Sequence, residues 1–314
     1  MRGNNIMATQ ATRGAAFEYS VIIKAVEILN TQHHNQITTD FTQGDGLKKF
    51  NSLSKNEQNK MSNAASKLIR RLYTLEPWLK NNNNLTVEHV KTVSGTYDVV
   101  DVYLHSGENK VGISCKSNHD ASRHSRVSPS IDVANIWLGL DTNYEYMDNI
   151  NNIFADFRDY CKKNNIELYS QLTAKQKDDI LYSPITQAFE NLLKQSIENN
   201  PEALRHMIYY LIGNTDFYKA IANFKNKILT IKSFNLRGDL NTGEILPLPT
   251  ECLKIARPMG SQSKSHNYIQ INCDNNWCIK MRIHNARSKI ENSLKWDVQL
   301  ESIPSNIFID DIPF

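Results

Sequence analysis

The sequence predicts a mixed α/β (α+β) fold for three reasons. An amphipathic helix lies near the start, two strand-like runs flank a turn at Gly107, and strand-like runs return in the final third. The 314 residues, 40% of them hydrophobic, can bury about three quarters of the unfolded surface without help from disulfides or metals. No Gly/Ser-rich or highly charged linker divides the sequence. We therefore expect one domain over residues 1–314, with residues 1–13 as a flexible tail.

The stretch AAFEYSVIIKAVEILN, residues 15–30, predicts the first helix because its apolar residues recur with helical spacing. On such a helix Glu18 falls on the same face as Val21, Ile22 and Ala25. A carboxylate buried alone is costly, so Glu18 either binds a partner such as a metal ion or reaches water at the edge of the apolar face. Residues 51–79 predict a second helical region that ends near Pro77.

Two strands and a turn are expected next. GTYDVVDVYL (95–104) and KVGISCK (110–116) are strand-like, and the HSGEN between them contains hairpin-turn residues. Side chains alternate between the two faces of a strand, so Ser114 and Lys116 share the face opposite the apolar residues of the second run. Lys116 is therefore expected to point away from the apolar layer.

The remaining two thirds of the chain are expected to be helical first and then extended. Residues 144–227 show helical periodicity, with a break at Ser183-Pro184. Strands are predicted by NYIQINC (267–273), WCIKMRIH (277–284) and KWDVQLESIP (295–304). The predicted order is helix, hairpin, helices and then strands.

Charge and cysteine content exclude several classes of protein. The 36 basic and 33 acidic residues give a formal charge of +3, so a nucleic-acid partner would have to bind a local basic surface. The five cysteines are scattered and lack zinc-site spacing, which indicates reduced thiols. The sequence shows neither an apolar signal-peptide region at its start nor an apolar run long enough to span a bilayer. We expect a soluble protein of the cytoplasm.

The predicted hairpin places carboxylates beside a lysine. Folding about Gly107 brings Asp98 or Asp101 next to Lys116, and the choice between the two depends on where the turn is centred. Carboxylates can hold Mg²⁺, and a lysine can orient water or stabilise charge on a phosphate, so the arrangement suits phosphodiester hydrolysis. An ordinary surface salt bridge is the commoner explanation of such a pair. A metal site that these aspartates share with Glu18 is the more specific hypothesis.

Two basic segments are candidate DNA-binding surfaces. The first follows Lys116 directly as a predicted loop and contains Asn118, His119, Arg123, His124 and Arg126. Arginine binds phosphates and reads guanine, although a solvated basic loop has the same composition. In the second segment, Trp277, Ile279, Met281 and Ile283 are expected to face inward. The outward or flanking polar residues there are Lys280, Arg282, His284, Asn285 and Arg287.

Several stretches together resemble the HaeIII-type family of type II restriction endonucleases. They are GAAFEYSVII, DVVDVYL, GISCKSNHDASRHSRVS, FYKAIANF with IKSFNLRGDLN, and MRIHNARSKIENSLKWDVQLESIP. The resemblance spans nearly the whole chain. It implies a homodimeric, Mg²⁺-dependent enzyme with a PD-(D/E)XK-like core and helical insertions. Such an enzyme cuts double-stranded DNA at a short palindrome, GGCC for the family's namesake, beside a companion cytosine DNA methyltransferase that protects the same site.

The resemblance also implies roles for individual residues. Asp98 or Asp101 takes the place of the metal-binding aspartate, Lys116 that of the lysine, and Glu18 that of the helix carboxylate. Ser114 stands where an acidic ligand is usual in PD-(D/E)XK nucleases, so it would bind metal weakly or through water. This departure concerns the set of metal ligands and leaves the expected reaction unchanged.

Two other functions remain open at this point. The histidines of KSNHDASRH are compatible with a ββα-metal (HNH-like) nuclease in which His119 is the base, but that motif needs a hairpin between its histidines. The serine at position 114 is compatible with a catalytically decayed or non-specific DNA-binding protein. The carboxylates and Lys116 argue against decay.

Overall fold

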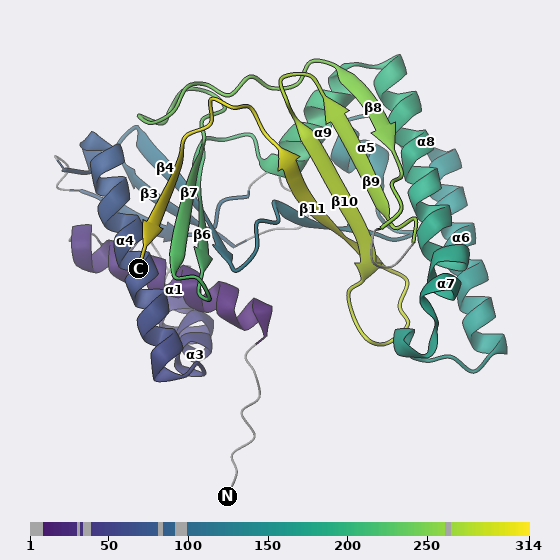
Figure 1. The fold of residues 1–314 in the computed structure, drawn as a ribbon, viewed down its shortest axis with the longest axis horizontal. Coiled ribbons are helices and arrows are strands. Elements are labelled where there is room, and N and C mark those ends of the chain that lie inside the picture. Colours follow the sequence, from purple (N-terminus) through teal and green to yellow (C-terminus); the bar gives the residue numbers. More distant parts are fainter. Residues whose placement is uncertain (1–8, 30–31, 34–38, 81–83, 92–98, 261–264) are drawn as a thin grey trace, which may run out of the picture. The chain divides into compact units, whose positions relative to one another are not determined.

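The computed structural model describes residues 9–29, 32–33, 39–80, 84–91, 99–260 and 265–314 (Figure 1). Helices and two β-sheets form the described chain, which confirms the mixed α/β prediction. The chain divides into two compact units, and each is assembled from separate segments. Unit 1 consists of Met1–Asp120, Asn214–Leu246 and Asn306–Phe314, and unit 2 of Ala121–Gly213 and Pro247–Ser305. That the chain forms one domain stays a prediction.

Unit 1 contains a seven-stranded sheet in the order β1-β2-β3-β4-β6-β7-β12. Its strands are β1 (Gln32–His33), β2 (Thr86–His89), β3 (Val102–Ser106), β4 (Asn109–Ser117), β6 (Phe217–Asn223), β7 (Ile228–Phe234) and β12 (Ile309–Pro313). The β3–β4 and β6–β7 pairs are antiparallel, whereas β4 and β6 are parallel. The β3–β4 hairpin, its parallel neighbour β6 and the first helix agree with the predicted PD-(D/E)XK-like core.

Two long helices share one hydrophobic core with this sheet. They are α1 (Gln10–Leu29) and α4 (Lys55–Leu75). Phe17 and Ile22 of α1, Leu68 of α4 and Ile113 of β4 are fully buried in this core. Shorter helical segments are η1 (Phe41–Asp45), α3 (Gly46–Asn51) and η2 (Pro77–Lys80). Because α1 begins at Gln10, residues 10–13 are its first turn and not a tail.

The predicted hairpin forms, with its first strand shorter than expected. Gly107 lies at the turn with φ of +57°, a conformation that favours glycine. Strand β3 begins at Val102, so Asp101 precedes the strand, although its N–H donates to the carbonyl of Ile113 at 2.9 Å. Asp98 lies outside the described residues. The backbone of Asp101 is thus held against β4 without belonging to a strand.

Unit 2 contains a five-stranded sheet in the order β5-β11-β10-β9-β8. The strands are β5 (Arg123–Val127), β8 (Cys252–Ala256), β9 (Tyr268–Cys273), β10 (Cys278–Asn285) and β11 (Leu294–Ser302). The helical segments are α5 (Val133–Leu138), α6 (Tyr144–Lys163), η3 (Tyr169–Gln171), α7 (Ala174–Lys177), η4 (Asp178–Tyr182), α8 (Ser183–Asn199) and α9 (Glu202–Ile212). The three strands predicted in the final third are confirmed as β9, β10 and β11.

Two details of the predicted helical region are wrong. The helices end at Ile212, and residues 217–223 form strand β6, because pairing with β4 and β7 outweighs a weak helical pattern. Ser183-Pro184 does not interrupt the chain's helical path either. A π-helical turn, η4, leads directly into α8, whose first turn accommodates the proline.

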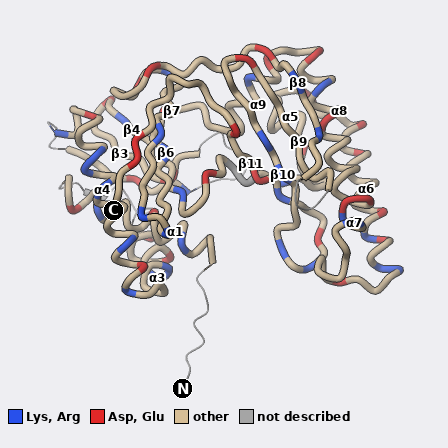
Figure 2. Tube along the Cα trace, in the orientation of Figure 1, with Lys and Arg blue, Asp and Glu red and all other residues tan. Residues whose placement is uncertain are grey.

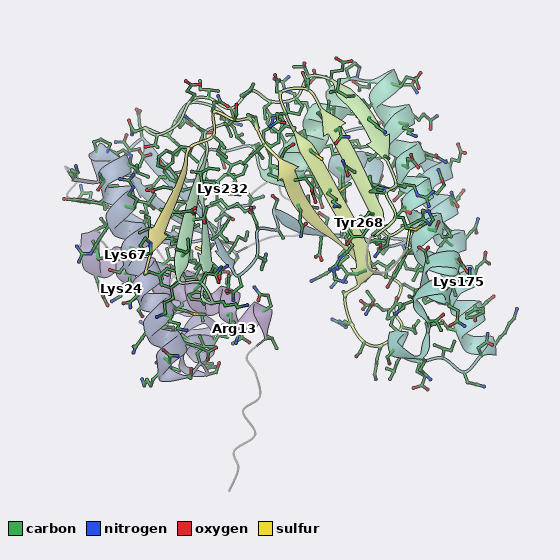
Figure 3. All side chains as sticks on the ribbon, in the orientation of Figure 1. Arg13, Lys24, Lys67, Lys175, Lys232 and Tyr268 are labelled. Carbon is green, nitrogen blue, oxygen red and sulfur yellow. The ribbon has the colours of Figure 1, made fainter. Side chains whose placement is uncertain are left out.

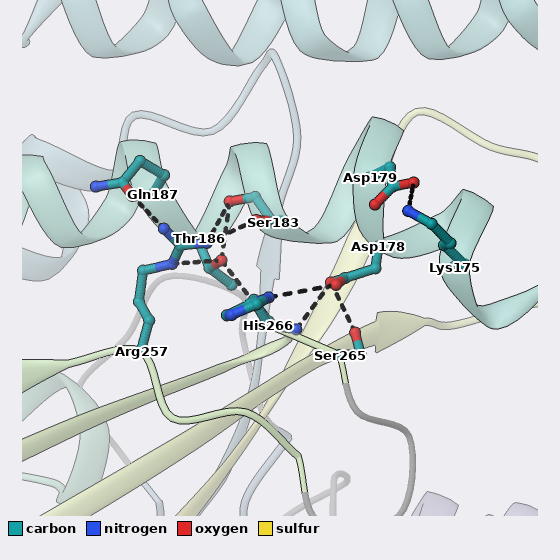
Figure 4. A network of polar contacts seen from close by, with 9 residues as sticks. All are labelled: Lys175, Asp178, Asp179, Ser183, Thr186, Gln187, Arg257, Ser265 and His266. Carbon is teal, nitrogen blue, oxygen red and sulfur yellow. Dashed lines mark hydrogen bonds and ion pairs between the residues drawn. The ribbon is translucent and has the colours of Figure 1, made fainter.

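Polar side chains join α8 and η4 to the strand connections of unit 2 (Figure 4). Arg257 donates to the Thr186 hydroxyl at 3.1 Å and to the Ser183 hydroxyl at 2.7 Å. Asp178 accepts from the Ser265 hydroxyl at 2.7 Å, so both ends of this network are satisfied. The hydrogen bonds of Arg257 therefore have a structural role within unit 2.

Acidic and basic residues are interspersed along both units (Figure 2). The five cysteines are free thiols, as predicted. No helix within the described ranges is long and apolar enough to cross a membrane.

Candidate active site

A carboxylate and a lysine meet where the hairpin of unit 1 opens. The Lys116 Nζ lies 3.7 Å from the Asp101 Oδ2. The same oxygen accepts from the Cys115 N–H at 2.6 Å and from the Ser114 hydroxyl at 3.4 Å. Asp101 therefore lies beside Lys116, whereas Asp98, the other aspartate left open by the sequence, is outside the described residues.

Glu18 approaches the same place from α1. Its Oε2 lies 3.5 Å from the Nε2 of His89, a buried residue at the end of β2 whose ring stacks on Phe41. The negative charge of Glu18 also acts on Asp101. Glu18 thus has the partner that its position on the apolar face requires. Sequence reasoning missed His89, because β2 lies about seventy residues away along the chain and no local pattern links it to α1.

Burial dominates the electrostatics of Asp101. Burial and the charge of Glu18 raise the pKa of Asp101 to about 6, although Lys116 and the Cys115 N–H favour the charged form. Two carboxylates that share a buried space repel each other when both are ionised. A strongly perturbed acid with a defined cationic neighbour is a feature of functional sites.

The donor set suits a hard divalent cation. Mg²⁺ prefers oxygen ligands and is commonly held by one or two carboxylates, with waters and substrate phosphates completing its shell. Asp101 and Glu18 supply two carboxylates, and the Ser114 hydroxyl lies beside Asp101. Among the residues that the structure describes, no group of three or more His, Cys, Asp or Glu is arranged to hold a metal.

Further charged residues lie on the same sheet face as Lys116. In the β4–β6 pair Ser114 is opposite Lys219, and in the β6–β7 pair Lys219 is opposite Lys232. Both lysines form ion pairs with Asp120, at 2.5 Å from Lys219 and 2.6 Å from Lys232. Sequence reasoning missed these three residues. The motifs FYKAIANF and IKSFNLRGDLN contain the two lysines, but their partner becomes visible only when the strands pair.

Asn118 and His119, two of the DNA-binding candidates, follow β4 within unit 1. The Asn118 N–H donates to the Ala222 carbonyl at 2.9 Å, and its side-chain oxygen accepts from the Phe224 N–H at 2.9 Å. Asn118 therefore ties the end of β4 to the β6–β7 turn while remaining exposed. His119 lies in the segment that follows it.

A cavity of about 440 Å³ lies beside Asn118. Its lining residues come from α1, α4, the segment after β4, the end of β6 and the β6–β7 turn, and they are Arg13, Glu57, Lys60, Met61, Asn118, Asn223, Phe224 and Lys225. Arg13 is labelled near the start of α1 in Figure 3 and pairs with Glu57 at 3.0 Å. Three cations against one acid make the cavity basic. Sequence reasoning missed these cations because three separate elements contribute them.

The basic segment after Asp120 is a strand, which corrects the predicted loop. Residues 123–127 form β5, which pairs with β11 in unit 2. Alternating backbone hydrogen bonds with β11 explain the extended conformation. Arg126 is opposite Lys295, is exposed, and donates to the Ser293 hydroxyl at 2.7 Å. The side chains of Arg123 and His124 lie outside the described part of the chain.

The pairing of β5 with β11 brings the part of the first basic segment from Arg123 onward into the sheet that contains β10. On β10 the inward and outward faces are as predicted, with Trp277, Ile279, Met281 and Ile283 buried. The outward side chains are paired with acids. Lys280 is 2.9 Å from Glu301, Arg282 is 2.9 Å from Asp297, and His284 is 3.1 Å from Asp297. DNA phosphates would have to compete with these carboxylates.

Asn285 and Arg287 follow β10. The Asn285 side chain accepts from the Tyr182 hydroxyl at 3.2 Å and donates to the Arg287 carbonyl at 2.7 Å. The Arg287 side chain is 74% exposed, compared with 47% for Arg282, and lies 3.8 Å from Glu291. Arg287 is thus the more available of these two arginines.

Comparisons with known proteins identify the family of the chain. The HaeIII restriction endonuclease family model matches residues 14–304. The chain belongs to the HaeIII restriction endonuclease family. It is also similar to the type II restriction enzyme HaeIII of Haemophilus aegyptius, with 31% identity over 96% of this chain and 97% of the relative. No solved structure matches the chain.

Membership of the HaeIII restriction endonuclease family decides the class of reaction. The protein is a type II site-specific deoxyribonuclease that acts on double-stranded DNA, and restriction endonucleases generally use a divalent metal ion. The structure also disfavours the ββα-metal alternative. In the described chain, His119 and His124 are separated by the short segment that enters β5, where that motif requires a hairpin.

Proposed function

We propose that this restriction endonuclease cuts GGCC in a Mg²⁺-dependent reaction at the site formed by Asp101, Glu18 and Lys116. The 3.7 Å approach of Lys116 to Asp101 carries the proposal. The charge of Glu18 acting on the same aspartate supports it. Asp98 and Ser114 remain candidates for the site, Asp98 as a second metal-binding aspartate and Ser114 through water.

Each side chain of the proposed site has a distinct task. Asp101 is oriented by the Cys115 N–H, so one of its oxygens is fixed before any ligand arrives. Glu18 contributes the second carboxylate from α1. Mg²⁺, when bound, would lower the pKa of a water and neutralise phosphate charge. Lys116 would hold a proton at Nζ and stabilise the charge that develops on the scissile phosphate.

DNA recognition is proposed for residues of both units. Asn118, His119, Arg123, His124 and Arg126 are proposed to bind the phosphate backbone, which fixes register. Lys280, Arg282, His284, Asn285 and Arg287 are proposed to include the base-reading side chains, because arginine matches the O6 and N7 acceptors of guanine. The cavity at Asn118 is compatible with a further phosphate contact.

The proposed assembly is a homodimer. A palindrome presents the same base edges twice, so a two-fold dimer reads both halves with one set of side chains. We further propose that the protein acts in the cytoplasm and that a companion cytosine DNA methyltransferase modifies the same site on host DNA. The two enzymes would share a recognition sequence without forming a stable complex.

A digest of unmethylated DNA with Mg²⁺ tests the proposal. We expect discrete fragments whose sequenced ends all map to GGCC, and resistance of DNA in which every GGCC carries the cytosine methyl group. Lys116→Ala should bind DNA in Ca²⁺ with unchanged affinity but cleave it more slowly by orders of magnitude, because it lacks a group that acts in the transition state.

Three outcomes would contradict parts of this proposal. Fragment ends at another sequence would reject GGCC and leave the nuclease assignment standing. Random ends would indicate a non-specific nuclease. Near-normal cleavage by Lys116→Ala would remove Lys116 from the mechanism.

A further inference from the structure

Three lysines of unit 1 share one sheet face on neighbouring strands. Lys116 lies on β4, Lys219 on β6 and Lys232 on β7. Residues directly opposite each other on paired strands point to the same face, and residues two apart along a strand do so as well. Ser114 is opposite Lys219, and Lys219 is opposite Lys232. The face that carries the proposed catalytic lysine therefore continues onto two further lysines.

Lys219 is buried, with only 2% of its surface exposed. A buried ammonium group needs a partner, because its transfer from water is otherwise very unfavourable. Asp120 provides two contacts to this group. The Lys219 Nζ lies 2.5 Å from the Asp120 Oδ1 and donates to the Asp120 carbonyl at 2.8 Å. Burial lowers the pKa of Lys219 to about 8, whereas the charge of Asp120 and its hydrogen bond favour the protonated lysine.

Lys232 completes the cluster from the other side. Its Nζ lies 2.6 Å from the Asp120 Oδ2, and the residue is labelled on β7 in Figure 3. Burial of Asp120 acts to raise its pKa, yet the two lysines hold that pKa below its ordinary value. Asp120 is thus an ionised carboxylate clamped through both oxygens and its own carbonyl.

The clamped residue lies four positions after Lys116. The intervening segment is anchored as well: the Gln10 side chain donates to the Ser117 carbonyl, and Asn118 bonds to Ala222 and Phe224. Asp120 is also the last residue of unit 1 before the chain enters β5 of unit 2. The end of β4, which carries Lys116, is therefore hydrogen-bonded to β6, to the β6–β7 turn and to α1.

We propose that Lys219 and Lys232 are positioning residues for DNA cleavage, acting through Asp120 on the segment that follows Lys116. The proposal rests on the proposed role of Lys116. It accounts for charged groups in FYKAIANF and IKSFNLRGDLN, two stretches that contain none of the proposed catalytic or DNA-contacting residues.

Stability alone does not account for the cluster. A buried ion pair is commonly no more stabilising than apolar residues of similar volume, although removing one partner is strongly destabilising. What charged partners add is a defined geometry, since Asp120 can satisfy both lysines in few conformations. A displacement of about 1 Å of a reacting group can lower a reaction rate by about 100-fold. Holding the end of β4 in place would therefore affect catalysis more than DNA binding.

The experiment compares cleavage with binding in the full-length protein. Lys219→Met and Lys232→Met are assayed for the single-turnover cleavage rate in Mg²⁺ on a DNA that the unmodified protein cuts, and for the DNA dissociation constant in Ca²⁺. We expect the rate to fall by about 100-fold while the dissociation constant changes by less than about threefold. Lys219→Arg, which keeps the charge, should recover part of the lost rate.

Arg71→Met is the matched control. Arg71 on α4 pairs with Asp310 on β12 at 2.6 Å, so its loss removes a part-buried ion pair of the same unit that does not reach β4. It should lower the melting temperature and leave the cleavage rate of the folded protein unchanged. If Lys219→Met does not fold, Lys232→Met decides the question, because Lys232 is less buried.

Two results would overturn the proposal. A normal cleavage rate per folded molecule in Lys232→Met, or in a folded Lys219→Met, would leave the cluster a purely structural ion network. Weakened DNA binding with an unchanged single-turnover rate would show that the lysines contact phosphate. Either result can occur while Lys116→Ala is inactive, so failure here is distinguishable from failure of the proposed function.

Discussion

Asp101 shows how burial sets the properties of a single side chain. Burial, with the charge of Glu18, raises its pKa to about 6 from an ordinary 3.8. The folded state thus binds the proton more tightly than the unfolded state does. The resulting stabilisation is fully present below pH 3.8 and is lost as the pH rises through about 6.

The stability of the metal-free protein should therefore depend on pH through Asp101. Between pH 4 and 7, the unmodified protein should lose about 1–3 kcal/mol more of its unfolding free energy than Asp101→Asn does. The amide oxygen of Asn can still accept from the Cys115 N–H, so the local geometry is retained. Urea unfolding in EDTA at several pH values measures the difference.

Asp179→Asn provides the control for Asp101→Asn. Asp179 is exposed and pairs with the exposed Lys175 at 2.6 Å, so its replacement should leave the pH dependence unchanged. Identical pH dependence in Asp101→Asn and the unmodified protein would contradict a raised pKa at Asp101.

Strand β5 is the element for which the structure differs most from the sequence prediction. Its basic sequence was predicted to form a loop directly after Lys116, yet it forms an edge strand of the sheet in unit 2. The same sheet contains β10, with its outward Lys280 and Arg282. The candidate DNA-binding residues from Arg123 onward are therefore collected in one sheet and the segment that follows β10.

Arg287 is the side chain in this region for which we expect a base-reading effect. Arg287→Ala should weaken binding to a GGCC duplex by about 1–3 kcal/mol and reduce discrimination against a duplex with one changed base pair. The measurement is the dissociation constant for both duplexes in Ca²⁺ at two salt concentrations. Arg205→Ala is the control, since Arg205 is exposed on α9 and pairs with Glu202.

The two duplexes distinguish base reading from phosphate binding. An equal loss of affinity on both, with a salt dependence that falls by about one unit of slope, would assign Arg287 to a phosphate. In that case Arg282 becomes the stronger candidate for reading guanine, once its pairing with Asp297 is broken.

The chain as a whole passes between its two units four times, after Asp120, Gly213, Leu246 and Ser305. Each unit consequently needs segments that are far apart in the sequence. Unit 1 obtains β6 and β7 from residues 214–246 and β12 from the C-terminal end. Neither unit can be produced as one continuous piece of the sequence.

This connectivity leads us to expect a single unfolding transition, in keeping with the predicted single domain. Far-ultraviolet circular dichroism and tryptophan fluorescence should give coincident urea transitions, because folding one unit alone would close long unfolded loops of the other at a cost in conformational entropy. Two separated transitions would show that the units are independent domains. Trp78 lies in unit 1 and Trp137, Trp277 and Trp296 in unit 2, so fluorescence reports on both.

The sequence alone determined the features that depend on local periodicity. The β3–β4 hairpin follows from alternating residues around a turn glycine, and α1 follows from helical spacing of apolar residues. The two-residue strand period also predicts the burial pattern of β10. The contact between an aspartate and Lys116 could also be predicted from the sequence, because a hairpin brings nearby residues of one chain segment together.

Tertiary structure alone decided the contacts between distant segments. The pairing of Glu18 with His89 and the ion pairs of Asp120 with Lys219 and Lys232 depend on which elements pack together. The same holds for β5, whose local sequence permits a loop until β11 offers backbone hydrogen bonds. Periodicity specifies the faces of an element but not its neighbours, which are selected by burial and hydrogen bonding over the whole chain.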